Sequence, residues 1–150
     1  MGLDMYLHAK RHLWSWQEES GDKAIADEVK NIANIPDDFK VTEIKIEVGY
    51  WRKANQIHRW FVQNVQDGKD DCGDYYVSRQ DLIDLKELCT NVIADKSLAP
   101  TELPTESGFF FGATEYDEWY YQDLTQTIEI IDKALTLDKH QWDFEYHSSW

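Results

Sequence analysis

The polar side chains best suited to chemistry lie in the segment from Gly49 to Val65, GYWRKANQIHRWFVQNV. On a helix of about 3.6 residues per turn, His58 falls within the apolar face and Asn55 lies near its margin. An imidazole and a carboxamide in these positions either bond to a neighbouring backbone or line a polar pocket. A pocket of this kind would bind a small ligand or serve a minor enzyme. Its residues are Trp51, Arg52, Asn55, His58 and Phe110.

A second candidate site lies between Ser97 and Asp132, where eight carboxylates and seven aromatic rings occur without any Lys or Arg. This segment carries much of the formal net charge of −14. A negative field with rings among the carboxylates favours a cationic partner, such as the basic nucleic-acid-binding groove of another protein. Direct binding of DNA or RNA is not expected, because phosphate contacts need Lys and Arg. The expected contact residues are Trp60, Glu115, Tyr116, Asp117, Glu118, Trp119 and Asp123.

Several of these contact residues also have a structural explanation. Asp117 and Glu118 fall in the first turn of an expected helix, where carboxylates interact favourably with the helix dipole. Trp119 lies on a second apolar side of that helix, and we expect the loop of residues 96–107 to cover it rather than leave it as an interface. Trp60 lies opposite the apolar face of its own helix, so it is either covered by another segment or a binding anchor.

Other kinds of active site have no support in the sequence. The two cysteines, Cys72 and Cys89, lack zinc-site spacing, and no Gly-rich phosphate loop or nucleophile elbow occurs. The loop DGKDDCGDYY departs from a calcium loop, because Tyr75 stands where the sharp turn needs Gly. Paired catalytic carboxylates are far rarer than acidic surfaces. We therefore expect a binding protein more than an enzyme, with no metal and no cofactor.

The elements expected to hold these residues indicate an α+β fold in one small domain. Alternating apolar residues predict five strands. They cover residues 2–9, 41–50, 75–77, 109–111 and 141–150. The first and last of these strands can pair side by side in a mixed or antiparallel sheet.

Helical periodicity predicts about four helices, the last of them the longest. They cover residues 22–35, 51–65, 78–93 and 116–137. Ser78 is expected to begin its helix with a capping box. Pro100 and Pro104 make residues 96–107 an ordered loop or a flap.

The N-terminus and the cysteines indicate where the protein acts. The opening MGLDMYLHAKR has too short an apolar run for a signal peptide or an anchor, and no segment approaches the roughly 20 apolar residues of a membrane span. Cys89 falls on an apolar helix face, where a small buried thiol is the usual interpretation. A reducing, intracellular setting and a cytoplasmic protein without membrane contact are expected.

Four segments of the chain carry a resemblance to a known family: GLDMYL, YWRKANQIHRWFV, DDCGDYYVSRQDL and SGFFFGATEYDEWYYQDL. Together they resemble a family of small acidic bacteriophage and prophage hypothetical proteins, over most of the chain. The resemblance implies an accessory protein that acts in the cytoplasm of an infected bacterium against a host defence system. It implies no activity and no functional residue.

Two hypotheses follow from the residues and the resemblance. In the first, the chain is a non-catalytic inhibitor that occupies the basic, nucleic-acid-binding surface of a host defence protein, with anti-CRISPR action on an effector as one form. In the second, it binds a small ligand, or acts as a minor enzyme, in the pocket around Arg52, Asn55 and His58. The sequence does not set the oligomeric state.

Overall fold

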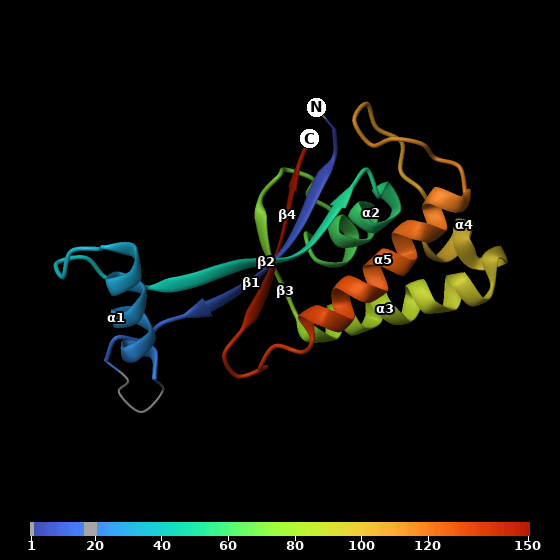
Figure 1. The fold of residues 1–150 in the computed structure, drawn as a ribbon. Helices are drawn as coiled ribbons and strands as arrows, with labels where there is room; N and C mark the ends of the chain where they lie inside the picture. The colour runs from blue at the N-terminus through green and yellow to red at the C-terminus, as the bar shows by residue number, and fades with distance from the viewer. Residues whose placement is uncertain (1, 17–20) are drawn as a thin grey trace.

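Four antiparallel strands in the order β2-β1-β4-β3 form the sheet around which the chain is built (Figure 1). In this computed structural model, which describes residues 2–16 and 21–150, they are β1 (Asp4–His12), β2 (Glu43–Arg52), β3 (Asp74–Val77) and β4 (Asp143–Ser149). The first and last strands lie side by side, with Asp4 opposite Ser149 and Lys10 opposite Asp143. The α+β class and the pairing of the terminal strands are therefore confirmed.

Five α-helices and a short 3₁₀ helix lie within the described residues. They are α1 (Asp22–Ala33), α2 (Asn55–Asn64), α3 (Arg79–Ala94), η2 (Lys96–Leu98), α4 (Ala99–Glu102) and α5 (Glu118–Ala134). Figure 1 shows α2, α3, α4 and α5 gathered on one side of the chain, whereas α1 lies far from them at the end of the long β1–β2 ribbon. Ser78 begins α3 with the expected capping box, in which Asp81 is the partner.

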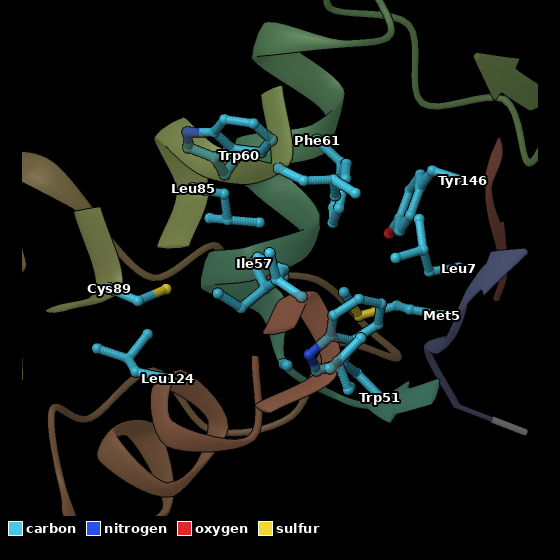
Figure 2. Packing of buried hydrophobic residues seen from close by; sticks show 14 of the residues in the cluster. Met5, Leu7, Trp51, Ile57, Trp60, Phe61, Leu85, Cys89, Leu124 and Tyr146 are labelled. Atoms are coloured by element: carbon cyan, nitrogen blue, oxygen red, sulfur yellow. The ribbon is translucent and has the colours of Figure 1, made fainter. Parts of the chain in front are cut away.

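The core lies between the helices and one face of the sheet (Figure 2). Met5 and Leu7 point into it from β1, as the alternation of that strand predicts, and both are fully buried. The rings of Phe61 and Tyr146 stack at 3.9 Å between centroids. Gly49 lets α5 approach β2 closely, because an added Cβ would collide with the side chain of Ile130.

The outer ends of β1 and β2 extend beyond the helices as a two-stranded ribbon with α1 at its tip (Figure 1). We call residues 11–16 and 21–47 the arm. Its own core is small: Leu13 and Ala26 are buried, while Ile32 and Phe39 are largely exposed. The ion pair between Arg11 and Asp22, 2.9 Å long and mostly buried, connects β1 to the start of α1.

Two predicted elements differ in the structure. Trp51 lies in β2 opposite Met5 rather than beginning a helix, because strand pairing continues to Arg52 and α2 begins only at Asn55. The predicted strand of residues 109–111 is wrong: these residues form a turn, held to the sheet by one bond from Leu3 N to Phe110 O of 3.1 Å. Three consecutive rings are a strand signal only where a neighbouring strand edge is free to pair.

The predicted loop at residues 96–107 also has local structure, since η2 and α4 occupy its first half. Pro100 stands near the start of α4, where its missing N–H costs no intrahelical bond. The helix predicted over 116–137 begins two residues later, at Glu118, with Asp117 as its N-cap. It remains the longest helix among the described residues.

Candidate functional site

Asn55, at the start of α2, holds the loop that precedes α5. Its side chain is 1% exposed, and its Nδ2 donates to Phe111 O at 3.0 Å and to Ala113 O at 2.8 Å. Its Oδ1 accepts from Glu106 N at 2.9 Å. One carboxamide thus satisfies three backbone groups of a segment without regular secondary structure, which is the role expected of a buried amide.

His58 belongs to a second buried network, one turn further along α2. Its Nδ1 lies 2.7 Å from the hydroxyl of Tyr146 and its Nε2 lies 3.0 Å from Asp70 Oδ2. Trp150 Nε1 donates to the other oxygen of Asp70 at 3.0 Å. Burial, with the nearby Asp70 and Cys72, raises the pKa of Tyr146 well above its ordinary value, so its hydroxyl stays protonated. His58 thus has a protein partner at each ring nitrogen.

The residues of the predicted ligand pocket therefore do not face one common space. Trp51 is fully buried, and its Nε1 donates to Thr127 Oγ1 at 2.9 Å. Asn55 and His58 point into the interior with protein partners, whereas Arg52 is exposed on β2. Phe110 is half-buried in the turn before α5. These polar side chains stabilise the fold, which is the structural alternative that the sequence left open.

Trp60, predicted as a possible anchor for a partner, is covered by the chain itself. It is only 9% exposed and meets Phe61 edge to face, with 5.3 Å between ring centroids. Figure 2 shows both rings within the buried hydrophobic cluster, to which Leu85 of α3 also belongs. Trp60 is therefore part of the core.

The start of α5 carries the exposed part of the predicted partner surface. Glu115, Asp117 and Glu118 are all exposed. Trp119 is 72% exposed, so the expected cover by residues 96–107 is wrong for this ring. Tyr116 is 37% exposed beside them. We call Glu115–Trp119, together with the hollow described next, the acidic–aromatic surface.

A hollow of about 450 Å³ opens beside these residues. It is lined by Lys96, Tyr116, Asp117, Glu118, Tyr121, Gln122 and Thr125. Lys96 Nζ lies 4.6 Å from the centre of the Tyr121 ring, a cation–π contact within the chain. The hollow thus combines two aromatic walls with two carboxylates and already attracts one cation.

Local hydrogen bonds hold this surface in place. Asp117 accepts from Tyr120 N at 3.1 Å, which caps α5. The hydroxyl of Tyr120 donates to Leu103 O at 2.8 Å, and Thr105 N donates to the Tyr116 hydroxyl at 3.3 Å. The first turn of α5 is therefore bonded to the segment that follows α4, and these bonds hold the backbone that carries the exposed side chains.

Asp123 differs from the other predicted contact residues, because it is half-buried beside α2. Gln56 Nε2 donates to its Oδ2 at 3.2 Å. Burial raises the pKa of Asp123 to about 6, and the charge of Asp117 adds to this, while the bond from Gln56 opposes it. Asp123 does not line the hollow.

Sequence reasoning missed four residues that line the hollow, namely Lys96, Tyr121, Gln122 and Thr125. It also missed Phe109, which is 95% exposed in the turn of residues 109–111. The glycines that flank residues 109–111 signal a turn as well as a strand end, and this signal identifies Phe109 as an exposed ring. Lys96 immediately precedes the segment from Ser97 to Asp132 that lacks Lys and Arg, so that pattern does not include it.

The remaining chemistry of the described residues is sparse. Both cysteines are free, and burial raises the pKa of Cys89 to about 12, so its thiol is inert. Within residues 2–16 and 21–150, no three His, Cys, Asp or Glu side chains gather in a way that would hold a metal ion. None of the helices described is both long and apolar enough to cross a membrane.

Comparison with known proteins adds no relative. No family model matches the chain, and no match was found among curated proteins or solved structures. The fold and the surface define a small α+β protein with an acidic–aromatic surface at the start of its longest helix.

Proposed function

We propose that this chain is a non-catalytic binding protein whose acidic–aromatic surface occupies a basic, nucleic-acid-binding surface of another protein. The observation that carries the proposal is Trp119, a large ring 72% exposed beside exposed carboxylates at the capped start of α5. Exposed Trp and Tyr side chains supply most of the binding energy at many interfaces, and carboxylates around them set orientation and association rate. A host defence protein, such as a CRISPR effector, is the partner that the sequence resemblance implies.

The hollow beside Trp119 fits one cationic side chain of such a partner. A guanidinium or ammonium group would lie against Tyr116 and Tyr121 and near the carboxylates of Asp117 and Glu118. A cation over an aromatic face contributes about 0.5 to 2 kcal/mol, the larger value when water is excluded. Lys96 would have to leave Tyr121, or share the ring, when the partner's cation enters.

The second candidate function, a small-ligand site at Arg52, Asn55 and His58, gains no support from the geometry. The polar side-chain atoms of Asn55 and His58 form hydrogen bonds with other protein groups, and Arg52 is exposed on β2.

Titration with an octa-arginine peptide tests the acidic–aromatic surface directly. In the double variant Glu115→Lys, Glu118→Lys, affinity at low salt should fall by at least about tenfold, since two favourable charges become repulsive. The matched control is Asp27→Lys, Glu28→Lys, which makes the same change in net charge on exposed positions of α1. Calorimetry should show the control close to wild type.

Two further results decide the outcome. Trp119→Ala should weaken binding by several-fold without changing net charge, because the ring covers the peptide's apolar stems. If both double variants lose affinity equally, the peptide senses only net charge and the proposed surface is wrong. The same holds if Trp119→Ala binds like wild type.

A further inference from the structure

Strand β2 is an edge of the sheet, and its two halves differ in how they are covered. Near its end, Gln126 of α5 donates to Tyr50 O at 3.0 Å, and Ile130 packs over Gly49. In the arm, from Glu43 to Glu47, Figure 1 shows none of the helices α2 to α5 alongside the strand. An uncovered edge of this kind presents unpaired backbone groups to another chain.

The register identifies which backbone groups point outward. Leu13 N donates to Thr42 O at 2.9 Å, and the pairing continues through His12 opposite Glu43 and Arg11 opposite Ile44. Antiparallel pairs alternate between bonded and non-bonded, so Ile44 bonds to β1 and its neighbours do not. The N–H and C=O groups of Glu43, Lys45 and Glu47 therefore face away from the sheet.

The side chains on this edge alternate in charge in a way that fits a second copy. Two copies related by a two-fold axis pair their outward residues with each other. If the axis passes Ile44, Glu43 lies opposite Lys45 of the other copy; if it passes Ile46, Lys45 lies opposite Glu47. An axis at Lys45 is disfavoured, because it places like charges opposite each other.

The surroundings of the edge support this pairing. Lys45 lies opposite Lys10 of β1, and both bond to the carboxylate of Glu145, at 2.7 and 2.9 Å. Lys10 also has Glu43 of its own copy at 3.7 Å, and a glutamate from a second copy would add a second carboxylate to Lys45 beside Glu145. Ile46, 37% exposed on the other side of the strand, would be covered at the same time. If the outward residues all had charges of one sign, like charges would face each other in every register. The alternating Glu43, Lys45 and Glu47 disfavour only the register centred on Lys45.

We propose that the chain self-associates through the Glu43–Glu47 edge of β2, which pairs with the same edge of a second copy in an antiparallel register centred on Ile44 or Ile46. The two sheets then form one continuous sheet. This inference is independent of the proposed function, because the edge lies in the arm and the acidic–aromatic surface lies at the start of α5.

Sedimentation velocity from low to high micromolar concentration, at physiological salt, tests the proposal. Wild type should show a monomer–dimer equilibrium. Lys45→Glu makes all three outward charges negative and should weaken the dimer by at least about tenfold. The triple variant Glu43→Lys, Lys45→Glu, Glu47→Lys restores opposite charges in both allowed registers, so it should dimerise again.

Lys86→Glu is the matched control, because it makes the same change in net charge and also removes an ion pair, the one with Asp132, but lies on α3. It should dimerise like wild type. In a Cys72→Ser background, either Ile44→Cys or Ile46→Cys should form a disulfide-linked dimer on oxidation, which identifies the axis. A wild type that stays monomeric throughout would overturn the proposal. So would equal weakening by Lys86→Glu and Lys45→Glu, or the absence of both cross-links.

Discussion

Two helices of this protein carry polar and aromatic side chains at similar density, but they use them differently. On α2, Asn55 and His58 point inward, and each bonds to protein groups on two sides. At the start of α5, Glu118 and Trp119 point outward. The residue types alone do not separate the two cases. The difference is whether the fold brings hydrogen-bonding partners to the side chain. A polar group with buried partners stabilises the fold, whereas an exposed group can bind another molecule.

The largest effect on stability is expected from Asn55→Ala. The substitution leaves Glu106 N, Phe111 O and Ala113 O without their partner, at about 1 kcal/mol or more for each buried group. We expect the free energy of unfolding to fall by about 3 kcal/mol in urea denaturation. Asn64→Ala, on the exposed side of the same helix, is the control and should cost less than about 1 kcal/mol. Equal costs would mean that Asn55 does not organise the loop.

Asp123→Asn should stabilise the protein at neutral pH but not at acidic pH. The pKa of Asp123 is raised to about 6 in the folded chain, so the unfolded chain loses this proton at lower pH than the folded chain does. The folded state is therefore penalised as pH rises from about 4, the ordinary pKa of aspartate, to about 6. Above that range the asparagine variant should be more stable by up to about 2 kcal/mol, allowing for partial solvent screening.

Thermal melts of both proteins across this pH range measure the difference. The gain should vanish below the ordinary pKa of aspartate, where both states of the wild type are protonated. A gain that is the same at low and high pH would show that the side chain acts through shape or hydrogen bonding rather than charge. Asp123 would then have a structural role like that of Asn55 rather than act as a charge like Glu118.

The smallest expected effect comes from Lys96→Gln, which removes the chain's own cation from the Tyr121 ring. Stability should change by less than about 1 kcal/mol, because the side chain is exposed. Affinity for octa-arginine should rise by about two- to fivefold, the range of one exposed cation–π contact. An unchanged or lower affinity would show that the hollow does not receive the peptide's cations.

The alternation of apolar residues was sufficient to predict β1, β4 and the pairing of the two chain ends. The helical period located α5 and its exposed carboxylates. It misplaced Trp51, because a strand that ends in Tyr-Trp-Arg and a helix that begins there have similar local patterns, and only pairing with Met5 decides between them.

The candidate site was predicted in part. Glu115, Asp117 and Glu118 are exposed, as a concentrated acidic segment indicates, whereas the sequence pattern favoured cover for Trp119, which is exposed beside them. The cover over Trp60 and the partners of His58 could not be predicted, since Asp70 and Tyr146 are separated from α2 in sequence and meet His58 only in the folded chain. The edge of β2 depends on strand order, which periodicity does not contain.

The most direct test measures stability and octa-arginine affinity in two proteins, the single variant Asn55→Ala and the double variant Glu115→Lys, Glu118→Lys. The account predicts opposite outcomes. At a temperature where it is folded, Asn55→Ala should bind like wild type although it unfolds more easily, and the lysine variant should lose binding while its unfolding free energy stays within about 1 kcal/mol of wild type. Folded Asn55→Ala with weakened binding, or a lysine variant that binds normally, would contradict the division between a structural α2 and a binding α5.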